Sequence, residues 1–144
     1  MKFSAKTLIA GLVLVAGVAL AETAATDANV IARQDLMKSF GGAAKTLGGM
    51  AGGEVAFDAA AAEAAKAVLI AGSAEIAAKF EVNAADPGSE AKPDVWTNWD
   101  DFALKAKGLN DAATALDAST VEGVQAGMGA IGGACKACHT AYRM

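Results

Sequence analysis

Both cysteines of the chain and its only histidine lie within five residues near the C-terminus, in the segment Cys135-Lys136-Ala137-Cys138-His139. Because an α-helix turns by about 100° per residue, the side chains of Cys135, Cys138 and His139 would leave one face of a helix. The C-x-x-C-H pattern is typical of covalent attachment of a c-type haem. Two thiols bond the vinyl groups, and the imidazole binds the iron. The sequence therefore predicts one haem c at Cys135 and Cys138, with His139 as an iron ligand.

Three other sites that use cysteine fit this segment less well. A structural zinc site needs four ligands, and the chain offers no second cluster of cysteine and histidine. A thioredoxin-like C-x-x-C belongs near a βαβ pattern, and no strand is predicted here. A disulfide between Cys135 and Cys138 would join residues within a single helical turn and would constrain little of the fold.

The N-terminus resembles a secretory signal peptide. Lys2 and Lys6 precede an apolar run from Leu8 to Leu20, and Ala19-Leu20-Ala21 provides small residues at the cleavage site. The run is shorter than the roughly 20 residues that a membrane-spanning helix needs. We therefore expect residues 1–21 to be removed, which leaves a single domain of residues 22–144 in the periplasm, without membrane insertion of the mature chain.

The charge of the mature domain narrows the range of its partners. The chain carries 12 basic and 16 acidic residues, and removal of the signal peptide takes two lysines and no acid, so the net charge changes from −4 to −6. An acidic exported domain is a poor candidate for binding nucleic acid or an anionic membrane. It is better suited to a basic protein partner, such as a soluble or membrane-bound redox protein.

The mature chain is predicted to be all-α. Helices are expected over 27–47, where the glycines from Gly48 onward would end the first helix, over 58–80, from Pro93 to about 116, and from a cap at Ser119 or Thr120 onward. Short connections favour antiparallel neighbours, so the predicted fold is an antiparallel up-down-up-down four-helix bundle. The expected inward residues of the second helix are Ala61, Ala65, Val68, Ile76 and Phe80. Because the core is rich in alanine and glycine, a large group at its centre would add much of its stability.

Several segments together carry a resemblance to a known family. They are Arg33-x-x-x-Met37-Lys38, Val95-Trp96, Asp100-Asp101-Phe102 and, most specifically, Gly132-Gly133-x-Cys135-x-x-Cys138-His139-x-x-x-Arg143. On these residues the chain resembles the class II cytochromes c, the cytochrome c′ family, which is a standard example of the up-down-up-down bundle. The resemblance covers most of the mature chain. It implies a non-enzymatic bundle with haem near the C-terminal end of the last helix, and often a homodimer.

The resemblance also implies two branches that differ in the sixth iron ligand. In one branch the distal face is open and binds nitric oxide or carbon monoxide; in the other, a methionine sulfur fills it and the protein carries electrons. Met128 precedes His139 by 11 residues on the same helix, about 16 Å away, and Met144 follows His139 on the proximal side. Met50 is expected in a glycine-rich loop, about 20 Å beyond Met37. Met37 is therefore the expected ligand.

Two arginines complete the predicted site. By resemblance, Arg33 lies near a haem propionate, although an arginine one turn before Met37 could also be a solvated surface residue. Arg143 lies one turn after His139, where it would flank the proximal side or the end of the last helix. The predicted function is electron transfer by an exported monohaem cytochrome with His/Met ligation. The alternative is a high-spin protein with an open distal face that binds nitric oxide or carbon monoxide, for gas binding or for detoxification of nitric oxide.

Overall fold

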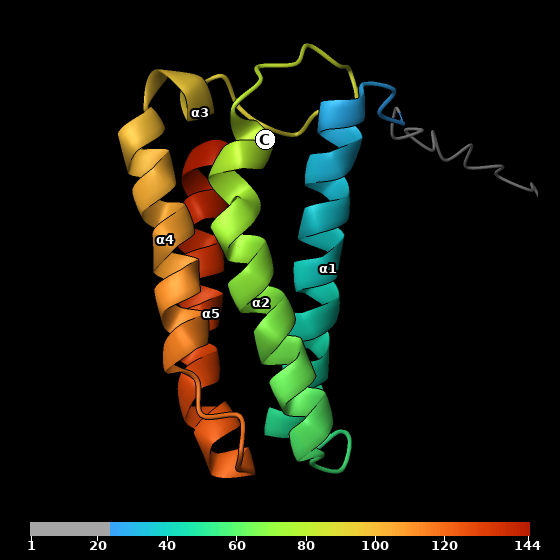
Figure 1. Ribbon diagram of the computed structural model, residues 1–144, viewed down its shortest axis with the longest axis vertical. Coiled ribbons are helices and arrows are strands. Elements are labelled where there is room, and N and C mark those ends of the chain that lie inside the picture. The colour runs from blue at the N-terminus through green and yellow to red at the C-terminus, as the bar shows by residue number, and fades with distance from the viewer. Residues whose placement is uncertain (1–23) are drawn as a thin grey trace, which may run out of the picture.

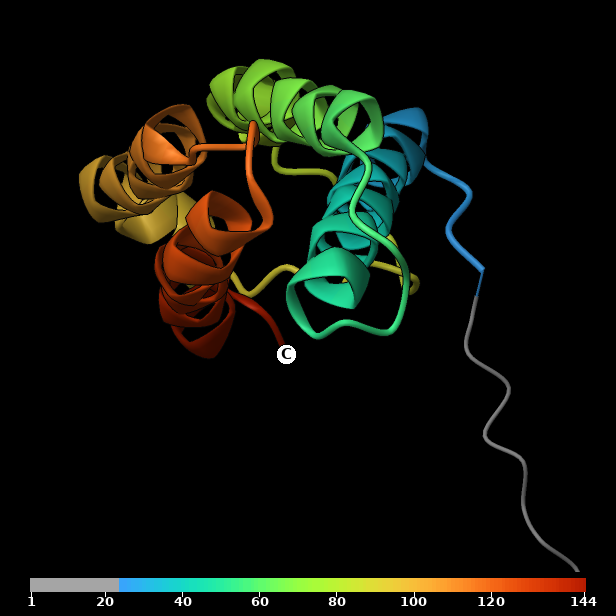
Figure 2. The ribbon, with the colours of Figure 1, turned by 90° about the horizontal axis from the view of Figure 1, so that it is seen from below.

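Four long helices and one short helix follow one another in the computed structural model, which describes residues 24–144. They are α1 (Ala28–Ala51), α2 (Ala59–Phe80), α3 (Asp94–Thr97), α4 (Trp99–Ala115) and α5 (Val121–Tyr142). The long helices run alternately up and down, and Figure 2 shows them around a common axis with α2 beside α1 and α4, and α5 beside α4. The predicted four-helix bundle is confirmed. The predicted signal peptide lies outside the described residues.

Side-chain caps begin three of the four long helices. Asp27 accepts hydrogen bonds from the N–H groups of Asn29 and Val30 at the start of α1, and Asp58 accepts one from Ala61 at the start of α2. Thr120, one of the two predicted caps of the last helix, accepts a hydrogen bond from the N–H of Gly123. These caps set where each helix enters the bundle.

The first helix is longer than its glycines predicted. Gly48 and Gly49 lie inside α1, which continues to Ala51 and ends at Gly52, followed by Gly53 with a φ of 72°. Each interior glycine costs about 1 kcal/mol of helix stability relative to alanine. Burial of Met50 against the core offsets part of this cost. The prediction that Met50 lies in a loop was therefore wrong, and the positive φ of Gly53 marks the true end.

Two further expectations differ from the structure. The third predicted helix is divided at Asn98 into α3 and α4, because Asn98 has a non-helical φ of −121° and ψ of 46°. On α2, Val68 was expected inside but is 41% exposed, and the neighbouring Leu69 is fully buried. In an alanine-rich helix several faces carry similar numbers of apolar residues, so the hydrophobic pattern predicted the wrong buried face at this turn.

Close contact between α1 and α2 depends on Gly72. A Cβ added there would lie 2.4 Å from Cε1 and 2.9 Å from Cζ of the Phe40 ring. Phe40 is buried, so its ring has little room to move. We therefore expect Gly72→Ala to lower the free energy of unfolding by about 1–3 kcal/mol through overpacking, measured by denaturant unfolding. Gly108→Ala, whose added Cβ meets nothing within 4 Å, should instead raise it by up to about 1 kcal/mol. Equal effects of the two substitutions would contradict this packing.

Both ends of the described chain are held at one end of the bundle, beside the loop between α2 and α3 (Figure 1). The carboxylate of Asp86 accepts hydrogen bonds from the N–H groups of Asp27, Thr26 and Gly88, which lower its pKa to about 2. At the C-terminus, the N–H of Lys92 donates to Tyr142 O, and the N–H of Met144 donates to Glu90 O, both at 2.9 Å. The end of α5 that carries the cysteines is thereby fixed.

Candidate haem site

Cys135 and Cys138 lie near the C-terminal end of α5, half-buried, and both pack against the hydrophobic core. The two thiols are not joined in a disulfide. Burial raises the pKa of each thiol, which disfavours the thiolate that a disulfide oxidoreductase requires. Among residues 24–144, no three side chains of histidine, cysteine, aspartate or glutamate come together in a group able to bind a metal ion. The two cysteines therefore fit attachment to a larger group better than direct redox or zinc chemistry.

His139 follows on the same face, one turn after Cys135. Partial burial of the imidazole, and secondarily the positive charge of Arg143, lower its pKa. Glu90 acts in the opposite direction. A lowered pKa favours the neutral imidazole, which is the form that binds a metal. The electrostatic surroundings of His139 therefore suit the role of an iron ligand.

Two contacts at the end of the bundle far from His139 define how α1 and α5 are aligned. Gln125 Nε2 donates a hydrogen bond of 2.8 Å to Ala51 O, and a Cβ added at Gly48 would lie 3.9 Å from Met128 Cε. Both contacts belong to one antiparallel alignment, in which position 51 lies beside position 125 and position 48 beside position 128. Fourteen residues separate Ala51 from Met37 along α1, and fourteen separate Gln125 from His139 along α5. Because helices rise equally per residue, Met37 and His139 lie at about the same height along the bundle.

The four methionines among residues 24–144 are found at different heights of the bundle. Met37 is half-buried and packs against the core at the level of His139. Met50 and Met128 lie toward the opposite end, where α1 finishes and α5 begins. Met144 is 74% exposed at the C-terminus, beyond the cap of α5. Met37 is therefore the methionine whose height matches that of the predicted proximal histidine.

Arg33 is buried, with only 3% of its surface exposed, so the interpretation as a solvated surface residue was wrong. Its guanidinium carbon lies 4.9 Å from the centre of the Phe80 ring and 5.3 Å from that of Trp96. Nε donates to Lys79 O at 2.9 Å, and Nη2 donates to Val82 O. Nη1 is buried and has no hydrogen-bond partner. A buried donor without a partner costs free energy, and an anionic group bound there would satisfy it.

Arg143 lies at the C-terminal cap of α5, where its N–H donates to His139 O at 3.0 Å. Its Nε pairs with Glu90 Oε2 at 2.6 Å, and an antiparallel bridge joins Arg143 to Ala91. The predicted position at the end of the last helix is therefore confirmed. These contacts attach the turn that carries His139 to the loop before α3.

Comparison with known proteins places this arrangement in a family. A family model described as Cytochrome C' matches residues 28–143. Cytochrome c-556 of Agrobacterium tumefaciens (strain apple 185) is 41% identical over 121 residues, which cover 78% of this chain and 92% of the relative. Cytochrome c-554 of Cereibacter sphaeroides is 35% identical over 138 residues, 90% of each chain. The chain belongs to the cytochrome c′ family.

Solved structures of cytochrome c′ share the fold. The structure from Rubrivivax gelatinosus matches with a TM-score of 0.70 and 27% identity. The matched part covers 81% of this chain and 94% of the Rubrivivax chain. A nitric oxide complex of a mutant cytochrome c prime from Alcaligenes xylosoxidans has a TM-score of 0.68 and 30% identity, with coverage of 80% and 93%. Members of the cytochrome c′ family are non-enzymatic proteins that bind one covalent c-type haem, so Cys135 and Cys138 are the attachment residues.

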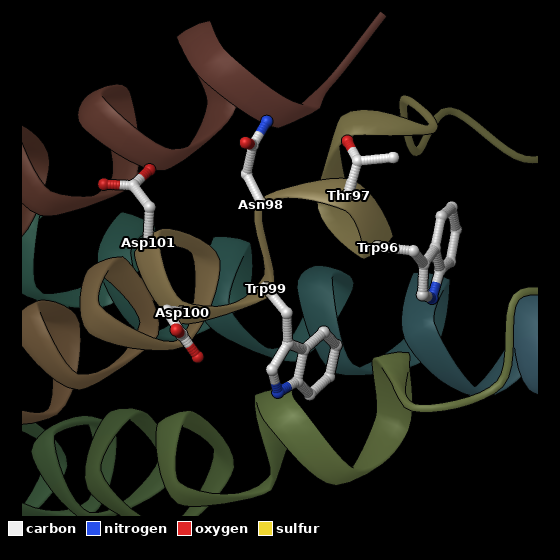
Figure 3. Close-up of a pocket in the computed structure, with 6 residues that line it drawn as sticks. All are labelled: Trp96, Thr97, Asn98, Trp99, Asp100 and Asp101. Carbon is white, nitrogen blue, oxygen red and sulfur yellow. The ribbon is translucent and has the colours of Figure 1, made fainter.

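The side chains at the end of α5 and on α1 fit a covalently bound haem. The two half-buried thiols lie on one helical face, and the unpartnered Nη1 of Arg33 is a donor suited to a carboxylate such as a haem propionate. No helix within residues 24–144 is long and apolar enough to cross a membrane. A hollow of about 440 Å³ between α3 and α4, lined by residues from Trp96 to Asp101, contains none of the predicted haem residues (Figure 3).

Tyr142, which holds the last turn of α5, was not predicted from the sequence. Tyr142 is 6% exposed, and its hydroxyl donates to Asp101 Oδ2 at 2.5 Å. Its ring contacts Phe102 edge-on with centroids 5.4 Å apart. Tyr142 follows Cys138 by four residues, a spacing that predicts a shared helical face and could have revealed its buried position.

The bond to Asp101 raises the pKa of Tyr142 to about 12, because the carboxylate stabilises the protonated phenol. We expect Asp101→Asn to lower this pKa toward its ordinary value of 10.0. Near-ultraviolet titration of the phenolate reads this group alone, since the chain has one tyrosine. Because the pKa is raised on folding, the bond stabilises the fold below about pH 10 and the contribution is lost as pH rises through about 12. An unchanged titration in Asp101→Asn would contradict the bond.

Proposed function

We propose that this chain is an exported, monohaem electron-transfer protein in which His139 and Met37 are the two axial ligands of the iron. The observation that supports this proposal most directly is the shared height of Met37 and His139 on antiparallel helices, derived from the contact of Gln125 with Ala51. A bound c-type haem supplies a one-electron couple of ferric and ferrous iron. Ligation by methionine sulfur would favour the ferrous state and limit rearrangement on electron transfer.

The chain's own residues have separate roles in this proposal. Cys135 and Cys138 hold the macrocycle covalently, and His139 donates an imidazole nitrogen to the iron. Met37, half-buried on α1, closes the distal side with a soft sulfur ligand. Arg33 binds a propionate through the unpartnered Nη1, because Nε and Nη2 already donate to carbonyl oxygens.

We also propose that the protein works in the periplasm with redox partners. The signal sequence at residues 1–21 supports export, and the acidic mature domain supports basic partner surfaces. Electron exchange with such a partner should be faster at low ionic strength, because salt screens the attraction between opposite charges.

The second candidate function is the binding of a small gas at an open distal face. Solved relatives from Alcaligenes xylosoxidans include complexes with nitric oxide and with carbon monoxide. If Met37 packs against the core without ligating iron, this chain would share that property.

An optical spectrum of the purified holoprotein, oxidised and reduced, with and without carbon monoxide, separates the two functions. Electron transfer with His/Met ligation predicts a low-spin spectrum in both states and slow or weak binding of carbon monoxide. A high-spin spectrum with ready binding of carbon monoxide would reject Met37 as a ligand and favour gas binding. A mature mass lacking one haem would exclude both.

A further inference from the structure

A charged cluster lies against the face of α5 that carries Cys138. Asp101, in the first turn of α4, accepts a hydrogen bond from Tyr142 at 2.5 Å through one oxygen. Its other oxygen pairs with Lys105 Nζ at 2.9 Å. Figure 3 shows Asp101 pointing toward α5, whereas the neighbouring Asp100 points away from it. The carboxylate of Asp101 is therefore fixed in place by two partners.

This cluster lies beside the attachment residue. Tyr142 follows Cys138 by four residues, so the two side chains share one face of α5, and the Asp101 carboxylate bonded to Tyr142 lies on that side of the helix. Lys105 and Asp101 therefore place opposite charges next to this face. Both charged side chains retain some exposure, at 28% for Lys105 and 51% for Asp101, so solvent and salt screen part of their effect.

We propose that Asp101, held by Tyr142 and opposed by Lys105, is an electrostatic determinant of the reduction potential of the haem attached at Cys138. A fixed negative charge stabilises ferric iron relative to ferrous iron, since the oxidised group carries one more positive charge. Asp101 therefore lowers the potential, and Lys105 raises it. The inference rests on the haem and its iron couple in the proposed function, but not on the identity of the sixth ligand.

Redox titration of the holoprotein and three charge variants tests this proposal. Asp101→Asn removes a negative charge and should raise the potential, whereas Lys105→Met removes a positive charge and should lower it. Asp100→Asn is the matched control, because it changes the same charge at the adjacent position and should produce a clearly smaller shift. The shift in Asp101→Asn should shrink as ionic strength rises. Equal shifts in Asp100→Asn and Asp101→Asn, or a rise in Lys105→Met, would overturn the proposal.

Tyr142→Phe separates charge from structure. This variant removes the hydroxyl that donates to Asp101 but retains the carboxylate and the packing of the ring on Phe102. If the charge sets the potential, Tyr142→Phe should not reproduce the rise seen in Asp101→Asn. Equal rises in both variants would mean that the bond acts by holding α5, which overturns the electrostatic role. Spin state and carbon monoxide binding, recorded on the same samples, report separately on the ligation by Met37.

Discussion

Replacing Met37 with leucine is expected to convert the haem from low-spin to high-spin and to open its distal side to carbon monoxide. Leucine retains the volume and the apolar character of methionine, so the packing should cost less than about 1.5 kcal/mol. It cannot donate a sulfur to the iron. The reduction potential should fall because a methionine ligand raises it. We expect the affinity for carbon monoxide to rise at least tenfold, equivalent to about 1.4 kcal/mol, since the gas no longer competes with a thioether.

Met128→Leu is the matched control for this experiment. Met128 is half-buried and packs against the core as Met37 does, but it lies near Gly48 toward the opposite end of the bundle. Its replacement should leave the spectrum, the potential and the affinity for carbon monoxide nearly unchanged. If Met37→Leu retains the spectrum of the wild-type protein, or if the wild type is already high-spin, Met37 is a packing residue and gas binding becomes the favoured function.

The helices and their order could be predicted from the sequence because several independent signals agreed. Short polar residues precede three of the long stretches that are predicted to be helical. Each of them caps a helix in the structure: Asp27, Asp58 and Thr120. The spacing of the two thiols and the histidine also places all three on one face of a helix, whatever the rest of the fold. Local chemistry was sufficient for these features.

Features that depend on contacts between helices were harder to predict. Gly72 resembles any other glycine in the sequence, yet its missing side chain is what accommodates the ring of Phe40. The burial of Arg33 between Phe80 and Trp96 requires α1, the end of α2 and α3 to meet, and no pattern within one helix encodes that meeting. The bond between Tyr142 and Asp101 likewise joins residues 41 positions apart.

Removal of both attachment residues, as Cys135→Ala with Cys138→Ala, is expected to leave a weakly stable, poorly packed bundle. Much of the buried core consists of alanine, which buries little apolar area: Ala43, Ala62, Ala65, Ala106, Ala113 and Ala118. Without a bound anion, the unpartnered Nη1 of Arg33 is expected to cost about 1–3 kcal/mol. A loss of each kcal/mol corresponds to roughly 3–6 °C in the melting temperature of a domain of this size.

The substitutions themselves should not cause this loss. Alanine has a higher helix propensity than cysteine, by up to about 0.7 kcal/mol, so both changes favour the helical conformation of α5. Wild-type protein produced without haem attachment is the second control, and it should melt like the double variant. Thermal unfolding followed by circular dichroism compares these two proteins with the holoprotein. A double variant that unfolds cooperatively at the temperature of the holoprotein would show that the alanine-rich bundle is stable on its own, and that the haem adds function without adding to the fold.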